Sequence, residues 1–352
     1  MEFGVTGAKI DDIGFIVHAE NLGYDYSWAT DSQLIRSNPW AVLALAATQT
    51  RKIKLGTGLA ISGLRLAPVA ANGIATINRL APGRTFLGIG TGNTAMRTMG
   101  QAPMRFKPFA EYVRVVRGLL DGEQVDYTLN GSTHAIKFDN LDLGIIDISN
   151  RIPIHVGGFG PMAQTLAGEI GDGVITGIPR GGSIPETLAN VKKGADRAGR
   201  SMEGFKTTAL ANLLMLEPGE TLQSERVISE CGSAIMANVH YLVDWVKETG
   251  KEPPAFVLPI WEEYLDFHNS RDEETKHQAL HASHYSYLDP EEARFVTPEM
   301  IRNFCIAGHP EEIVEQLHGL EKQGLNALNF ITPLEQRYGL IENFARKVME
   351  KM

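Results

Sequence analysis

The feature of this chain that most limits its fold is a repeated alternation of short β-rich runs with amphipathic helical segments. This order favours a parallel sheet with right-handed crossovers, because each helix returns the chain to the edge where the next strand starts. Eight such strands with helices between them close into a (β/α)8 TIM barrel, an α/β fold. The predicted strands are Glu2–Thr6, Tyr26–Thr30, Lys52–Leu59, Thr85–Ile89, Pro153–Val156, Gly173–Thr176, Lys206–Leu216 and Ala327–Ile331. The predicted helices lie at about Ile10–Asn21, Pro39–Thr50, Ala67–Leu80, Lys107–Leu120, Met162–Glu169 and Pro310–Gln323.

Two segments are longer than the ordinary loops of such a barrel. Residues 122–151 are predicted to form a surface β-hairpin around an Asn130-Gly131 turn. Residues 221–307 are predicted to form a mostly helical insertion before the last strand, long enough to cover the barrel mouth as a lid. Because barrels of this kind run past the usual domain length, residues 1–352 are predicted to form a single domain.

Composition narrows the classes of function. The net charge is −9 and no basic run stands out, so we expect no nucleic-acid partner. There is neither a basic, apolar leader nor a run of about 18 apolar residues, so we expect no membrane partner and a cytoplasmic location. Cys231 and Cys305 lack metal-ligand spacing, and His281 and His284 lack a third ligand, so no metal site is expected.

Glycines follow four of the predicted strands, at the end of a barrel where ligands bind. The most informative run is Pro153–Met162, in which a short apolar strand stops at Gly157-Gly158-Phe159-Gly160 and a helix follows. Backbone N–H groups at such a turn approach a ligand closely, and the helix N-terminus attracts negative charge. The run therefore indicates either a phosphate cradle or a tight turn with no ligand.

Three further runs complete a recognisable order with this cradle: Gly23–Asp31, Thr50–Gly58 and Pro82–Gly92. In this order the chain resembles the bacterial luciferase-like superfamily, which holds FMN-dependent monooxygenases and F420-dependent oxidoreductases. Within it the chain is most similar to the branch that contains methylenetetrahydromethanopterin reductase. The resemblance covers about residues 1–215 and resumes at Gly308-His309-Pro310.

The resemblance implies roles for individual residues. Those implied to hold the cofactor phosphate are Gly157, Gly158, Phe159 and Gly160, helped by Thr176 and Gly177. The Gly58-Leu59 bond stands where family members carry a non-prolyl cis peptide against the flavin ring. Thr91 and Asn93 are implied to bind the polar edge of the ring, and Asp31 to lie beside it.

The chain departs from the family directly after Asp31. Several relatives have a histidine there that transfers a proton, whereas this chain has Ser32, a poor general base without a partner. A replacement is expected in the insertion, where His281 and His284 lie among tyrosines. We predict Asp31 and His284 as the catalytic residues, the alternative being that both histidines are solvated lid residues.

The resemblance leaves three functions open. The first is a monooxygenase that uses reduced FMN, supplied by a separate flavin reductase, to oxygenate a small organic substrate. The second is an F420-dependent oxidoreductase that moves a hydride between the deazaflavin and its substrate. The third is a non-enzymatic flavin-binding barrel. The resemblance also implies a homodimer.

Overall fold

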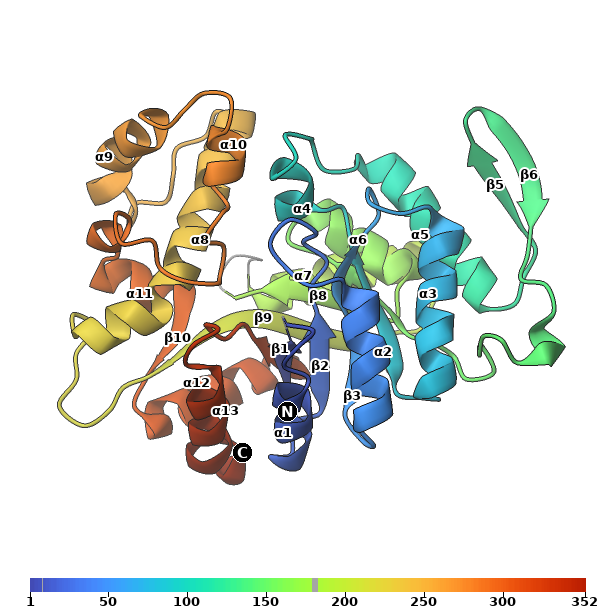
Figure 1. The fold of residues 1–352 in the computed structure, drawn as a ribbon, viewed down its shortest axis with the longest axis horizontal. Helices are drawn as coiled ribbons and strands as arrows, with labels where there is room; N and C mark the ends of the chain where they lie inside the picture. The colour runs from blue at the N-terminus through green and yellow to red at the C-terminus, as the bar shows by residue number, and fades with distance from the viewer. Residues whose placement is uncertain (8, 179–182) are drawn as a thin grey trace.

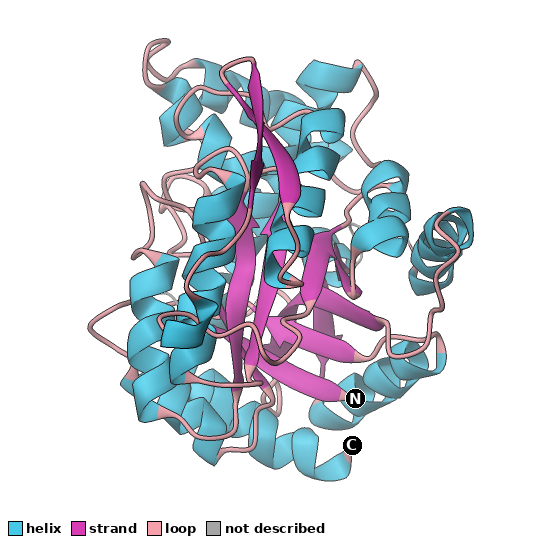
Figure 2. Ribbon diagram, turned by 90° about the vertical axis from the view of Figure 1, so that its right-hand side faces the viewer, coloured by secondary structure: helices cyan, strands magenta, loops and turns pink. Residues whose placement is uncertain are grey.

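Eight parallel strands close into a barrel in the computed structural model, which describes residues 1–7, 9–178 and 183–352. Their order is β9-β11-β1-β2-β3-β4-β7-β8, and the pairing of β8 with β9 closes the ring. Figures 1 and 2 show the strands at the centre with helices around them. The predicted (β/α)8 fold is therefore confirmed. The barrel strands are β1 (Glu2–Gly7), β2 (Tyr26–Ala29), β3 (Lys54–Ile61), β4 (Thr85–Gly90), β7 (Ile154–Gly157), β8 (Gly173–Gly177), β9 (Lys206–Met215) and β11 (Ala327–Phe330).

Helices cover the outside of the barrel. The first begins at Gly14 and not at Ile10, because the turn before it is built around Asp12, whose carboxylate accepts hydrogen bonds from Arg337 and Tyr338. The covering helices are α1 (Gly14–Asn21), α2 (Pro39–Gln49), α3 (Ala67–Leu80), α5 (Phe106–Leu120), α6 (Pro161–Ile170), α7 (Ile184–Arg197), α12 (Pro310–Lys322) and α13 (Arg337–Lys347). Short helices are α4 (Asn93–Arg97) and the 3-10 turns η1 (Leu141–Leu143), η2 (Ala293–Phe295) and η3 (Met349–Lys351).

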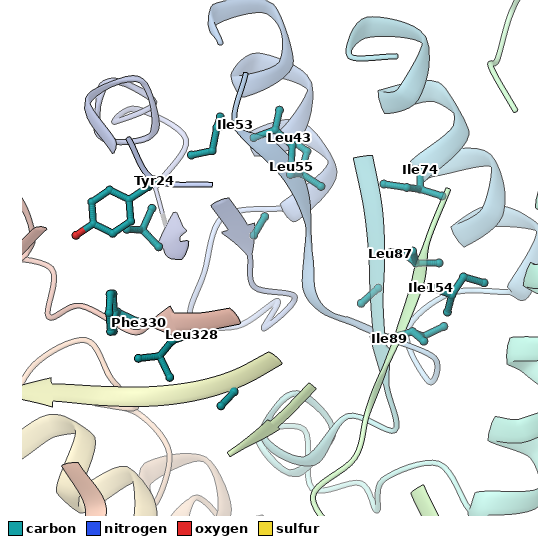
Figure 3. Packing of buried hydrophobic residues seen from close by; sticks show 14 of the residues in the cluster. Tyr24, Leu43, Ile53, Leu55, Ile74, Leu87, Ile89, Ile154, Leu328 and Phe330 are labelled. Carbon is teal, nitrogen blue, oxygen red and sulfur yellow. The ribbon is translucent and has the colours of Figure 1, made fainter. Parts of the chain in front are cut away.

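The main core lies between the barrel and this helix layer. Aliphatic side chains from the outward faces of the strands meet those of the helices, as Leu43, Leu55 and Ile74 show in Figure 3. Inside the barrel, His155 stacks on Phe86 with ring centroids 5.4 Å apart and is buried. The interior is thus filled, and open space is left to the strand ends.

The two long segments form as predicted in outline. The hairpin pairs β5 (Val125–Leu129) with β6 (Ser132–Ile136), and Asn130 and Gly131 both take positive φ, at 51° and 80°. The insertion stands beside the barrel mouth in Figure 1 and has an apolar core of its own. It consists of α8 (Glu225–Thr249), α9 (Leu258–Asn269), α10 (Lys276–Ala279), α11 (Pro298–Phe304) and β10 (Cys305–Gly308).

The strand β10 is the part of the insertion that the periodicity did not predict. It pairs in parallel with β9, outside the closed ring, and so ties the insertion to the barrel. Among the described residues, no helix is long and apolar enough to cross a membrane.

Candidate active site

A cavity of about 460 Å³ opens at the carboxyl ends of the barrel strands. Its wall is built by the turns after β2, β3, β4 and β7 and by two parts of the insertion, α8 and the segment around His284. The insertion therefore lines part of the barrel mouth, and its role as a lid stays a prediction.

The cavity brings together all but three of the residues predicted for the site. Those that line it are Asp31, Gly58, Leu59, Thr91, Asn93, Gly157, Phe159, Gly160 and His284. Gly158, Thr176 and Gly177 lie behind the wall. The amide of Gly158 already donates to the carbonyl of Ile175 at 2.8 Å, so it holds β7 and β8 together and is not turned to the cavity.

Glycines give the cavity a flat wall on the side of β3 and β7. The Gly58-Leu59 peptide is cis, which confirms that prediction, and the pairing of β3 with β4 shifts register at the same place. A Cβ atom at Gly58 would lie 2.3 Å from Cε3 of Trp28, and one at Gly157 would lie 2.6 Å from Cδ1 of Leu59. A side chain at Gly58 would meet the Trp28 ring and one at Gly157 would displace Leu59, so glycine backbone lines the cavity at both positions.

Asp31 lies just past β2, next to β3 in the ring, and is 2% exposed. Its Oδ2 accepts a hydrogen bond from the Ile61 amide at 3.1 Å and forms an ion pair with Arg65. Its Oδ1 is buried without a hydrogen-bond partner among the described residues, as are Trp28 Nε1 and Thr30 Oγ1 on the same wall. Buried polar atoms are normally paired, so unpaired atoms that surround one cavity indicate a polar ligand there.

His284 enters the cavity from the insertion and is buried. Its Nε2 lies 3.2 Å from Thr94 Oγ1 and 3.3 Å from the Tyr241 hydroxyl, and these two hydroxyl groups contact each other. The next residue, Tyr285, adopts the left-handed φ of 57°, which a non-glycine residue rarely takes outside constrained sites. The imidazole is therefore fixed in direction by groups from both the barrel and the insertion.

The other predicted histidine, His281, does not line the cavity. Its Nε2 lies 3.1 Å from Asp244 Oδ2, behind His284. Burial lowers the pKa of His281, and the bond to Asp244 opposes that shift only in part.

Residues of the site that were not predicted include Arg36, Thr94, Arg97 and Tyr241 on the cavity wall and Arg65 beside Asp31. Arg36 and Arg65 follow β2 and β3, so a search for cations just past strand ends would have found them. Thr94 follows the predicted Asn93. Tyr241 lies in the insertion, where no motif marks it.

The cavity wall carries no metal centre in the part of the chain that is described, since no group of three or more His, Cys, Asp or Glu side chains is placed to hold an ion. What the site offers is a wall with backbone at its glycines, a buried carboxylate beside it and an imidazole next to two hydroxyl groups. This arrangement suits a planar organic group with a polar edge and a second, smaller molecule beside it.

Comparison with known proteins agrees with this geometry. The sequence profile described as luciferase-like monooxygenase matches residues 8–327. The 5,10-methylenetetrahydromethanopterin reductase of Archaeoglobus fulgidus is 29% identical over 345 residues, or 95% of this chain and 94% of that protein. The F420-dependent glucose-6-phosphate dehydrogenase of Beutenbergia cavernae is 31% identical over an alignment 368 residues long, gaps included, which covers 98% of this chain and 94% of that protein.

Solved structures share the fold. The coenzyme F420 dependent tetrahydromethanopterin reductase of Methanopyrus kandleri superposes with a TM-score of 0.65 at 24% identity and covers 99% of both chains. The oxygenating constituent of 3,6-diketocamphane monooxygenase from Pseudomonas putida, in complex with FMN, gives a TM-score of 0.64 at 16% identity and covers 100% of this chain and 99% of that one.

Proposed function

Because the chain belongs to the luciferase-like monooxygenase family, we propose that it is an F420-dependent oxidoreductase that moves a hydride between the deazaflavin and a small organic substrate. Full-length relatives support F420: the B. cavernae enzyme is named for it and aligns along nearly the whole chain. The reduced-FMN monooxygenase, which the sequence first suggested, is the second candidate. It has the family description and a solved structure with FMN in its favour, but that structure is alike in fold alone.

The observation that carries the proposal is the set of unpaired buried atoms on the cavity wall, above all Oδ1 of Asp31. They would pair with the polar edge of a flavin-type ring, which F420 and FMN share, in the cavity that Gly58 and Gly157 line. The choice of F420 over FMN rests on the full-length relatives. When bound, this cofactor supplies or accepts the hydride. Arg65 keeps the Asp31 carboxylate in place, and the insertion lines the substrate side of the cavity.

We assign the proton to His284. Hydride transfer to a carbonyl leaves an alkoxide oxygen that must take up a proton, and the reverse reaction must remove one. In this proposal the Nε2 atom of His284, which contacts the hydroxyl groups of Thr94 and Tyr241, exchanges that proton. General acid–base groups of this kind contribute about 10²- to 10⁴-fold to the rate. His284 would thus take the role of the histidine that several relatives carry at the position of Ser32.

The test is a pair of titrations, one with F420 and one with FMN. Binding is monitored by the quenching of cofactor fluorescence and by the change in tryptophan fluorescence. We expect saturable binding of F420 and at least about tenfold weaker binding of FMN. Tight FMN binding with negligible F420 affinity would move the proposal to the monooxygenase. Failure of the folded protein to bind either cofactor would favour the non-enzymatic barrel.

A matched pair of variants places the binding in this cavity. Gly157→Val puts a side chain where a Cβ atom already meets Leu59, so F420 affinity should fall by at least about tenfold. Gly319→Val on α12 is the control, because a Cβ atom there meets nothing within 4 Å. Equal F420 affinity of the two variants would place the cofactor elsewhere.

We also propose that the protein is a homodimer. Light scattering on the protein as it elutes from a size-exclusion column checks this.

A further inference from the structure

One cation on the cavity wall has no carboxylate partner. Arg36 lies in the turn after β2 and is half-buried. Its guanidinium donates to three neutral acceptors: the Ile35 carbonyl at 2.8 Å, Ser286 Oγ at 2.6 Å and the His284 carbonyl at 2.7 Å. A guanidinium has five N–H donors, so donors remain for another group.

The other arginines of the site, among the described residues, are neutralised. Arg65 pairs with Asp31, and Arg97 pairs with Asp244 and Glu248. No carboxylate of the described residues lies within ion-pair distance of Arg36, and residues 8 and 179–182, which fall outside the description, include no Asp or Glu. Burial lowers the pKa of Arg36 to about 10, with no neighbouring charge to offset it. Hydrogen bonds to the insertion alone would not require a charged side chain.

The position of Arg36 decides which molecule it faces. The turn after β7, where the cofactor phosphate is expected, lies three strands away around the ring, past β3 and β4. Arg36 instead adjoins His284, whose carbonyl it holds and whose imidazole faces the same cavity. A group bound to Arg36 is therefore beside the atoms that exchange the proton, on the substrate side.

We propose that Arg36 binds an acidic group of the substrate, so that the substrates of this protein are small organic anions bearing a carboxylate or a phosphate. The planar guanidinium matches either oxyanion through two parallel N–H···O bonds. The inference rests on the proposed function, because it places the substrate beside a cofactor bound in the same cavity. It makes Arg36 a specificity residue that also holds the insertion against the barrel.

The test uses acetate and inorganic phosphate as probes and neutral acetamide as their control, at constant ionic strength, with tryptophan fluorescence and thermal unfolding as readouts. Wild-type protein should bind at least one of the two anions saturably and should not respond to acetamide. Arg36→Gln should weaken anion binding by at least about tenfold, because a charge-assisted hydrogen bond is lost. Arg36→Lys, which keeps the charge without the fork, should fall between them.

Ser286→Ala separates anion binding from attachment of the insertion. It removes one hydrogen bond of Arg36 and leaves the charge, so its anion affinity should stay within about twofold of the wild type. The proposal would be overturned if Ser286→Ala and Arg36→Gln lost anion affinity equally. It would also be overturned if the wild-type protein bound neither anion, or if Arg36→Lys bound the two anions no more tightly than Arg36→Gln.

A titration with F420 distinguishes the two possible sources of the oxyanion. If the acidic group belongs to the substrate, Arg36→Gln should change F420 affinity by less than about twofold, and acetate or phosphate should bind with F420 present. Competition between the anion and F420, with an equal loss of both in the variant, would assign the group to the cofactor and refute the substrate class. The anion titrations need no cofactor, so they give a result even if F420 does not bind and the proposed function fails.

Discussion

Replacing Asp31 by Asn should destabilise the protein strongly, since it breaks the one ion pair at the base of the cavity whose carboxylate is almost fully buried. The Asp31 side chain is 1% exposed and its partner Arg65 is 18% exposed. Removing one member of a buried pair costs about 3–5 kcal/mol, because the other charge stays buried without compensation. Arg65 keeps some contact with water, so we expect about 3 kcal/mol. The Ile61 amide is not part of this cost, because the Asn carbonyl can still accept its hydrogen bond.

The assay is urea unfolding at pH 7, monitored by tryptophan fluorescence. Asp31→Asn, Arg65→Met and the double variant are compared with the wild type under one common slope of unfolding free energy against urea concentration. Each single variant should lose about 3 kcal/mol, whereas the double variant, which buries no lone charge, should lie within about 1 kcal/mol of the wild type. Additive losses in the double variant, or a loss below about 0.5 kcal/mol in Asp31→Asn, would refute the reasoning. F420 affinity of the double variant then reports what Asp31 does apart from folding.

Three further predictions rest on other parts of the structure. Burial lowers the pKa of His155 from 6.5 to about 4. As the pH falls, the imidazole is therefore protonated in the unfolded chain before it is protonated in the folded one. The stability that neutral His155 contributes is complete above pH 6.5 and is lost as the pH falls toward 4. The free energy of unfolding should drop by up to about 3 kcal/mol over that range, and a pH series in urea should show a shallower drop for His155→Gln; parallel curves would contradict it. Gly92→Ala should cost about 2 kcal/mol, because Gly92 has a φ of 90° and a Cβ atom there would lie 2.3 Å from Cγ2 of Ile61; Gly131→Ala, with a φ of 80° and open space around it, is the control in the same urea assay and should lose less. Thr94→Val combined with Tyr241→Phe removes both hydroxyl groups from His284 and should lower turnover by about tenfold while F420 affinity stays within about twofold, measured by steady-state kinetics and by titration; an unchanged turnover would argue against His284 as the proton-transfer group.

The barrel was readable from the sequence because its strands carry a local signal. Each is a short apolar run that ends in glycine or a polar turn, and all eight predicted strands end within two residues of the observed ones, as at Thr85–Gly90. Helix α7 was also readable, since Ser183 and Glu186 form a capping box around Pro185, but the prediction passed over it. The strand β10 could not be read, because its four residues become a strand only by pairing with β9.

In the site, too, the residues marked by local motifs could be predicted and those that meet through long-range contacts could not. The glycine wall and Asp31 follow strand ends in a fixed order, so motifs could locate them, and close approach of backbone is what makes glycine necessary at Gly58 and Gly157. The partners of His284 could not be predicted, because Thr94 and Tyr241 are 147 residues apart and meet only after the insertion folds against the barrel. The same contact brings Ser286 to Arg36, 250 residues away. Under the proposed function, substrate choice depends on a long-range interface that local patterns do not encode, so variants in the insertion should change specificity without changing the cofactor wall.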